Sequence, residues 1–285
     1  MTGLMRSEFR KIATTNTWWL FLLAVLAFTA LSFAFNALQA HSYLHSPPPQ
    51  LPPDVPPDQA RQIMADYQAR TALVVQAANL YTSGQYFGLL FVLLLGILVV
   101  TNEFFHQTAT STFLVTPRRT RVVVSKLAVT VLGAIGLCVA TMALSIIAGV
   151  IFLQIDGADR FALTESAVVR ALALNLLAYG IWAVFGVGFG TLIRSQVVAV
   201  IVALVLYLVA STIASSLIQL LSFLLHADWI RKLAVVVPSV ASQAMISGGD
   251  IPGNPPQWLG AVVLIGYGVA AGAIGTVLTQ RRDVG

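Results

Sequence analysis

Charged residues are scarce in this chain of 285 residues. Asp, Glu, Lys and Arg make up 9% of it, against roughly a quarter in an ordinary soluble protein, whereas 58% of its residues are apolar. A soluble fold of this composition could not keep so much apolar surface away from water. The composition therefore predicts a membrane protein.

Two further absences exclude classes of function. Cys138 is the single cysteine, so neither an internal disulfide nor a cysteine-based zinc cluster can form, and we interpret it as a small buried apolar side chain. No lysine follows a glycine, so the chain lacks the Gly-x4-Gly-Lys-Ser/Thr loop that cradles nucleotide phosphates. We therefore expect no ATP hydrolysis, no other enzymatic activity and no cofactor in this chain itself.

Six uncharged stretches stand out instead. They cover approximately residues 18–38, 85–101, 127–153, 171–193, 195–222 and 258–280. Each is free of Asp, Glu, Lys, Arg and His and is about long enough to cross a bilayer as a helix. Because they are continuously apolar rather than alternating, they exclude a β-barrel. The predicted fold is all-α, a single polytopic membrane domain of six transmembrane helices over residues 1–285.

The charges between these stretches predict the orientation of the chain. With a cytoplasmic N-terminus, the inner segments hold ten basic and three acidic residues, and the outer segments hold six basic and eight acidic residues. Basic residues collect on the cytoplasmic side of membrane proteins. Arginine outnumbers lysine, and Ala and Val are abundant, as in many bacterial proteins. We expect the bacterial inner (plasma) membrane, with both termini in the cytoplasm.

Three polar segments flank the predicted spans. Residues 1–17 separate apolar from basic residues on two helical faces, which indicates an interfacial amphipathic helix resting on the lipid bilayer. Residues 39–84 begin with a proline-rich spacer and continue as a predicted external helix that Asp58 caps. Residues 223–257 read as an external or re-entrant segment with a short helix.

The segment between the second and third spans, residues 102–117, predicts a short cytoplasmic helix. Asn102 can cap it, Glu103 lies in its first turn where the helix dipole favours a carboxylate, and Pro117 ends it. A short polar helix at the membrane surface is a natural docking site for a soluble partner. The basic residues from Arg118 onward are sufficiently explained as anchors to acidic lipid, and nothing supports nucleic-acid binding.

A row of polar side chains recurs every four residues along the fifth span: Tyr207, Ser211, Ser215 and Gln219. Such a row on an apolar helix faces protein or a wet pathway rather than lipid. Two interpretations stay open, hydrogen bonding between helices and lining of a substrate pathway. Asn175, Tyr179 and Trp182 of the fourth span could contribute in the same way.

Two histidines, His41 and His45, lie four residues apart at the outer end of the first span. On a helix they share a face and could hold a metal ion. The sequence offers no evident third ligand, and Pro47 limits the helix. We interpret them as polar residues at the membrane interface rather than as a metal site.

Glycines at four-residue spacing occur in two spans. Gly186 and Gly190 belong to a Gly-x-Gly-x-Gly run that superficially matches a dinucleotide loop, and Gly268 and Gly272 form a second pair. Both pairs lie within apolar spans, where this spacing favours close helix packing. We interpret them as packing contacts.

The stretch from residue 103 to residue 126 resembles the ABC-2 type permease family, the membrane subunits of many ATP-driven exporters. The residues that carry this resemblance are Glu103, Phe104, Thr108, Thr112, Thr116, Pro117, Arg118, Arg121 and Lys126. Gln107 stands where the family usually has a glycine. The entry segment around Trp18 and residues 238–243 are also similar to the family, and the six-span layout covers the whole chain.

This resemblance implies a permease subunit that pairs with a second permease, identical or not, and with separate ABC ATPase subunits that bind ATP and Mg²⁺. Residues 102–117 would form the coupling helix, with contacts to the ATPase from Glu103, Phe104, Thr108, Thr112, Pro117 and Arg118. The polar row of the fifth span would line the substrate pathway. The uncharged spans favour an amphipathic or apolar cargo.

Two other functions remain open from the sequence. An ATPase-independent carrier or channel is disfavoured, because ion-driven carriers usually keep an ionisable group near the bilayer midplane and the six spans contain none. The spans also lack the His and carboxylate ligands that an intramembrane metalloprotease needs. A membrane anchor or assembly factor for a cell-envelope complex fits the external proline-rich segment as well as a transporter does.

Overall fold

The structure is a computed structural model that describes residues 17–105, 119–157, 162–193, 195–225, 227–249 and 254–281, together with Ser7 and Arg10. Within these residues the chain is helical and contains no strand. Six helical segments are long and apolar enough to cross a membrane, which confirms the predicted multi-pass all-α fold. The predicted interfacial helix of residues 1–17 lies almost wholly outside the described residues.

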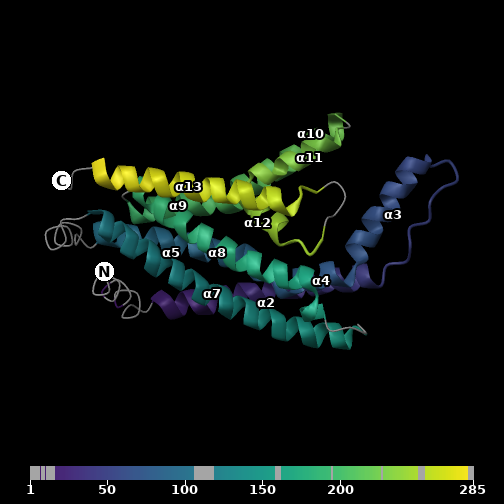
Figure 1. The fold of residues 1–285 in the computed structure, drawn as a ribbon, viewed down its shortest axis with the longest axis horizontal. Coiled ribbons are helices and arrows are strands. Elements are labelled where there is room, and N and C mark those ends of the chain that lie inside the picture. The colour runs from purple at the N-terminus through teal and green to yellow at the C-terminus, as the bar shows by residue number, and fades with distance from the viewer. Residues whose placement is uncertain are drawn as a thin grey trace.

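The six spans run roughly parallel along the long axis of the molecule (Figure 1). The elements are α2 (Thr17–Leu44), α3 (Pro57–Thr71), α4 (Leu73–Tyr81), α5 (Gln85–Phe105), α7 (Arg119–Ile155), η1 (Ala162–Thr164), α8 (Ser166–Leu192), α9 (Gln196–Leu204), η2 (Val205–Ala210), α10 (Ser211–Leu225), α11 (Asp228–Lys232), η3 (Leu233–Val236), α12 (Pro238–Ile246) and α13 (Gln257–Arg281). The start of α2 and the end of α13 lie at one end of the bundle, and α3 and α11 lie at the other.

Helix α8 occupies the centre of the bundle because its glycines admit a neighbour on each side. A Cβ atom on Gly186 would lie 2.6 Å from the carbonyl oxygen of Leu93 in α5. A Cβ atom on Gly188 would lie 2.5 Å from the carbonyl oxygen of Ala271 in α13. The helices therefore touch backbone to backbone. A Cβ atom on Gly190 would lie 3.0 Å from Ile97 Cα of α5, so the packing interpretation of Gly186 and Gly190 is confirmed.

The segment after the proline-rich spacer forms two helices rather than the single predicted one. The chain is extended at Ala72 (φ −62°, ψ 123°), so α3 and α4 are separate. Pro56 is the N-cap of α3, and Asp58 lies in its first turn instead of capping it. Helix α3 carries charges and has no buried residue, whereas the apolar α4 is mostly buried in the bundle. The break separates a polar helix from an apolar one.

Large apolar side chains are exposed along the outer faces of the bundle. They include Leu23, Leu31 and Phe35 of α2, Leu132, Val139 and Ile147 of α7, Ile201 of α9, Ile213 and Leu217 of α10, and Val262 and Val269 of α13. Water would disfavour so many exposed apolar groups, whereas lipid accepts them. These faces have the chemistry of a lipid-contacting surface, whereas α5 and α8 form the buried interior.

The segment between the fifth and sixth spans folds back against the bundle. Helix α12 packs on α8 and α13 and buries Ser239, Ser242 and Met245 among others. Gln85 at the start of α5 donates a hydrogen bond to the carbonyl oxygen of Ser242 at 3.2 Å. The short helix expected within residues 223–257 is present as α12.

Candidate functional site

The fifth span leaves the bundle halfway along its length. Its first part, α9, packs against α5, whereas α10 lies against α11, η3 and α12. The turn between them, η2 (Val205–Ala210), is a π-helix, and Figure 1 shows α10 diverging from the neighbouring spans. A π-helical turn interrupts the regular hydrogen-bond register and is frequent at functional sites.

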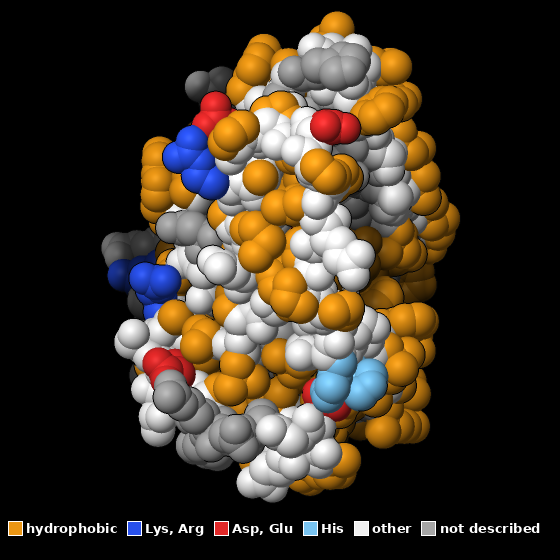
Figure 2. Space-filling model, turned by 90° about the vertical axis from the view of Figure 1, so that its right-hand side faces the viewer, with side chains coloured by type: hydrophobic (Ala, Val, Ile, Leu, Met, Phe, Trp, Pro, Cys, Tyr) orange, Lys and Arg blue, Asp and Glu red, His pale blue; other side chains and the backbone are white. Residues whose placement is uncertain are grey.

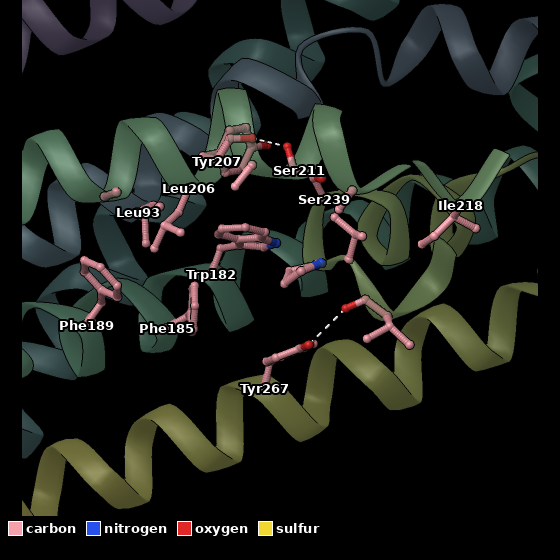
Figure 3. A pocket seen from close by; sticks show the side chains of 16 residues that line it. Leu93, Trp182, Phe185, Phe189, Leu206, Tyr207, Ser211, Ile218, Ser239 and Tyr267 are labelled. Atoms are coloured by element: carbon pink, nitrogen blue, oxygen red, sulfur yellow. Dashed lines mark hydrogen bonds between the residues drawn. The ribbon is translucent and has the colours of Figure 1, made fainter. Parts of the chain in front are cut away.

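A cavity of about 460 Å³ lies beside this divergence. Its wall comes from α5, α8, the fifth span, the η3–α12 segment and α13, through Leu93, Trp182, Phe185, Phe189, Ala203, Leu206, Tyr207, Ala210, Ser211, Ala214, Ile218, Val236, Val237, Pro238, Ser239 and Tyr267. Figure 3 shows Trp182 between the helical turn that bears Tyr207 and the helix that bears Tyr267. Four spans therefore contribute to one cavity.

Most polar atoms of the aromatic wall already have partners inside the protein. The indole of Trp182 donates to Ser242 Oγ at 2.8 Å, and the Tyr207 hydroxyl donates to the carbonyl oxygen of Tyr86 at 2.6 Å. The Tyr267 hydroxyl donates to the carbonyl oxygen of Val236 at 2.9 Å. The wall therefore presents mainly ring faces and aliphatic groups, a chemistry that suits an apolar ligand.

The predicted polar row divides where α10 departs from the bundle. Tyr207 and Ser211 line the cavity, and the Ser211 hydroxyl donates to the carbonyl oxygen of Tyr207 (Figure 3). Ser215 donates to the carbonyl oxygen of Ser211 at 2.6 Å, one turn back in the same helix. Gln219 is exposed on α10. Ser215 and Gln219 lie outside the cavity wall that the described residues form.

The three polar residues of the fourth span also separate. Trp182 lines the cavity, but Tyr179 and Asn175 are buried deeper in the bundle. The Tyr179 hydroxyl lies 3.1 Å from Thr141 Oγ1 and donates to the carbonyl oxygen of Gly84 at 3.2 Å. Tyr179 therefore joins the second, third and fourth spans, and the Asn175 amide lies 4.0 Å from Cys138 Sγ of the third span.

Sequence reasoning named Trp182 and Tyr207 but missed the other three aromatic residues of the wall. Phe185 and Phe189 follow Trp182 at helical spacing on α8, and the rings of Trp182 and Phe185 meet edge to face at 5.5 Å. Tyr267 contributes from α13. The aromatic spacing on the fourth span was a usable signal, whereas the contribution of residues 236–239 depends on how α12 folds back.

At the other end of the bundle, the second span runs further than predicted. Helix α5 continues to Phe105, so Asn102 does not begin a new helix, and Glu103 lies in the last turn of α5. The Glu103 carboxylate is 7% exposed and lies 2.9 Å from the equally buried Lys126 Nζ of α7. Because the dipole disfavours a carboxylate at a helix C-terminus, the lysine supplies the compensating charge.

Lys126 joins the two helices through a second contact. Its Nζ atom donates to the carbonyl oxygen of Val99 at 3.0 Å, one turn before Glu103. Lys126 is therefore not a lipid anchor, in contrast to the exposed Arg121. Thr108, Thr112, Pro117 and Arg118 lie outside the described residues, and Phe104 belongs to the last turn of α5. The ion pair connects the two helix ends on either side of residues 106–118.

Comparison with known proteins places this architecture in a family. No curated protein matches the chain significantly. A family model, described as a protein of unknown function, matches residues 62–285, which contain five of the six spans and all residues of the cavity wall. The chain therefore belongs to the DUF2705 family.

Proposed function

We propose that the chain is the membrane permease subunit of an ATP-driven exporter in the bacterial inner membrane and that its cargo is apolar or amphipathic. The observation that carries this proposal is the aromatic cavity beside the diverging fifth span. Its volume of about 460 Å³ lies within the usual range of small-molecule pockets. Its polar side-chain atoms are largely satisfied, so a ligand would be held by apolar contact.

The ion pair between Glu103 and Lys126 supports coupling to a separate ATPase. By resemblance to ABC-2 type permeases, residues 102–117 carry the contacts to the ATPase subunit, and α5 and α7 flank this segment. A displacement of the segment would move the two joined helices together, and Leu93 of α5 lines the cavity. In this proposal Glu103 positions the segment, and residues such as Thr108 and Thr112 contact the ATPase.

The proposed transporter needs partners that supply what this chain lacks. ABC ATPase subunits would bind ATP and Mg²⁺, and a second permease, identical or not, would complete the membrane part. Both termini would lie in the cytoplasm, as the distribution of basic residues predicts. The end of the bundle that holds α3 and α11 would then face outward.

One observation favours a second candidate function. Helix α3 has no buried residue and extends from the end of the bundle, a placement suited to a protein partner (Figure 1). A membrane anchor or assembly factor for an envelope complex would use such a helix and would not need the cavity. An ATPase-independent carrier is less well supported, because the residues that line the cavity include no ionisable acid, lysine, arginine or histidine.

A cavity-filling substitution tests the proposed binding site. In Ser211→Trp the indole would occupy the cavity, whereas in Thr212→Trp it would start from an exposed neighbouring position. We expect Ser211→Trp to lower photolabelling of the Trp182 peptide by a diazirine fatty acid about tenfold, which corresponds to about 1.4 kcal/mol. Thr212→Trp is the matched control and should label as the wild type does.

The labelled peptides are identified by mass spectrometry after irradiation in native membranes. Equal labelling in both variants and the wild type would show that the probe reaches α8 from bulk lipid rather than through the cavity. That result would remove the main support for a transport pathway here.

A further inference from the structure

Two histidines and an aspartate from distant parts of the sequence meet at one end of the bundle. His41 lies in the last turn of α2, His45 follows the last residue of α2, and Asp156 follows the last residue of α7. One ligand atom from each of the three residues lies within 4.8 Å of the other two. Figure 2 shows this end of the molecule, where histidine side chains lie beside an acidic side chain.

Local structure brings the three side chains together. Helix α2 ends at Leu44, and the His45 N–H still donates to the His41 carbonyl oxygen at 3.1 Å, which leaves the two ring centroids 4.4 Å apart. His41 Nδ1 lies 2.5 Å from Asp156 Oδ1, and His45 Nδ1 lies 3.7 Å from Asp156 Oδ2. Gly157 follows with a positive φ of 84°, a backbone conformation that glycine adopts readily.

The burial of the aspartate points to a missing ligand. The Asp156 side chain is 8% exposed, and its buried Oδ2 has no hydrogen-bond partner among the described residues. An unsatisfied buried carboxylate oxygen is costly. The two imidazoles beside it are 59% and 54% exposed, so their rotation would open a path from solution to this oxygen.

We propose that His41, His45 and Asp156 bind a divalent transition-metal ion, with Zn²⁺ as its representative. Two imidazole nitrogens and one carboxylate oxygen are a common donor set for Zn²⁺, and water would complete a tetrahedron. Ca²⁺ and Mg²⁺ prefer oxygen ligands alone and fit this set poorly. The donors must close to bonds of about 2.1 Å, which rotation of the exposed imidazoles permits.

The ion would join the first span to the third. Helices α2 and α7 already pack against each other, and the three ligands lie at the ends of these two helices. Metal binding would therefore restrain the relative movement of these spans at the end opposite the Glu103–Lys126 pair. This inference is independent of the proposed transport function.

A zinc titration of the full chain tests the site. The protein is purified in detergent with a tag that contains no histidine, stripped with chelator, and titrated with ZnCl₂ against a chromophoric competitor. We expect one Zn²⁺ per wild-type chain and a rise in the unfolding temperature on binding. Mg²⁺ at the same concentration should neither bind nor shift that temperature.

Single substitutions assign the ligands. His45→Ala leaves the His41–Asp156 contact in place, so it should fold normally and lose affinity for Zn²⁺ at least about tenfold. Asp156→Asn should remove saturable binding. His226→Ala changes a histidine elsewhere in the sequence and should bind as the wild type does.

Two results would overturn the site. One is the absence of saturable zinc binding to the wild type, which would leave the cluster as a histidine–aspartate ion pair. The other is wild-type affinity in both His45→Ala and Asp156→Asn, which would place the zinc elsewhere. The unfolding temperature of each variant without metal shows whether it folds. If Asp156→Asn does not fold, the zinc affinity of His45→Ala alone decides the outcome.

Discussion

Single side chains in this protein have roles that their positions in the sequence did not reveal. Glu103 was predicted at the start of a surface helix, and the structure places it at the buried end of α5, 2.9 Å from Lys126. The residue types pointed to a charged cytoplasmic junction, but their pairing depends on how α5 and α7 pack. The same holds for Asp156, because nothing in the sequence indicates that α7 ends beside His41.

Removing one partner of the buried ion pair should destabilise the protein strongly. Glu103→Gln leaves Lys126 buried without its carboxylate, and Lys126→Met leaves the Glu103 carboxylate without its lysine. We expect each single variant to lose about 3–5 kcal/mol of stability, because an uncompensated charge stays buried. The double variant should be more stable than either single one. Thermal unfolding in detergent measures all three.

An exposed acidic residue provides the control for this experiment. Asp58 pairs with Arg61 on the surface of α3, and both side chains are largely exposed. Asp58→Asn should leave the unfolding temperature unchanged, because exposed ion pairs contribute little. If Glu103→Gln is equally neutral, the pair does not connect α5 to α7, and the proposed coupling loses its mechanical basis.

At the scale of elements, the apolar stretches predicted the spans but not their internal breaks. Residues 171–193 and 258–280 correspond closely to α8 and α13. The extended residue at Ala72 and the π-helical turn at Val205–Ala210 lie within sequences that read as continuous helices. Hydropathy records how apolar a stretch is and not its hydrogen-bond register, so these breaks, and the cavity beside one of them, could not be predicted.

The glycine contacts between α5 and α8 should be essential for the spacing of these helices. A Cβ atom on Gly96 would lie 2.7 Å from backbone atoms of Gly186 and Val187. Because backbone atoms cannot rotate away, Gly96→Ala should push the helices apart and cost about 1–3 kcal/mol. The midpoint of thermal unfolding in detergent measures this loss.

Gly180 of α8 provides the control position for Gly96→Ala. A Cβ atom there meets nothing within 4 Å, so Gly180→Ala should be neutral or slightly stabilising through the better helix propensity of alanine. Equal tolerance of both substitutions would show that α5 and α8 are not in backbone contact. Equal loss would indicate a general cost of altering glycines in these spans.

At the scale of the whole molecule, the fold has two ends with different features. One end holds the Glu103–Lys126 pair, and the other holds α3 and the His41–His45–Asp156 cluster. The cavity lies between four spans of the bundle. In the permease that we propose, events at one end would be transmitted to the cavity through α5 and α7.

A photoreactive residue in the segment between α5 and α7 should locate the partner. Thr108 replaced by a benzophenone amino acid in the native host should crosslink to a soluble ATPase subunit. The same residue at Ile63, which is exposed on α3 at the opposite end, should not. Immunoblotting of the tagged chain measures the adducts. Crosslinks to the same partner from both positions, or from Ile63 alone, would contradict the proposed coupling segment.

The most direct measurement is affinity purification of the tagged chain from its native membrane in mild detergent, followed by mass spectrometry and an ATPase assay. The proposed function predicts a stoichiometric soluble subunit that carries a nucleotide phosphate loop, together with vanadate-sensitive ATP hydrolysis. Recovery of the chain alone in several mild detergents, without hydrolysis, would contradict an ATP-driven permease. Recovery with envelope proteins instead would favour the anchor function.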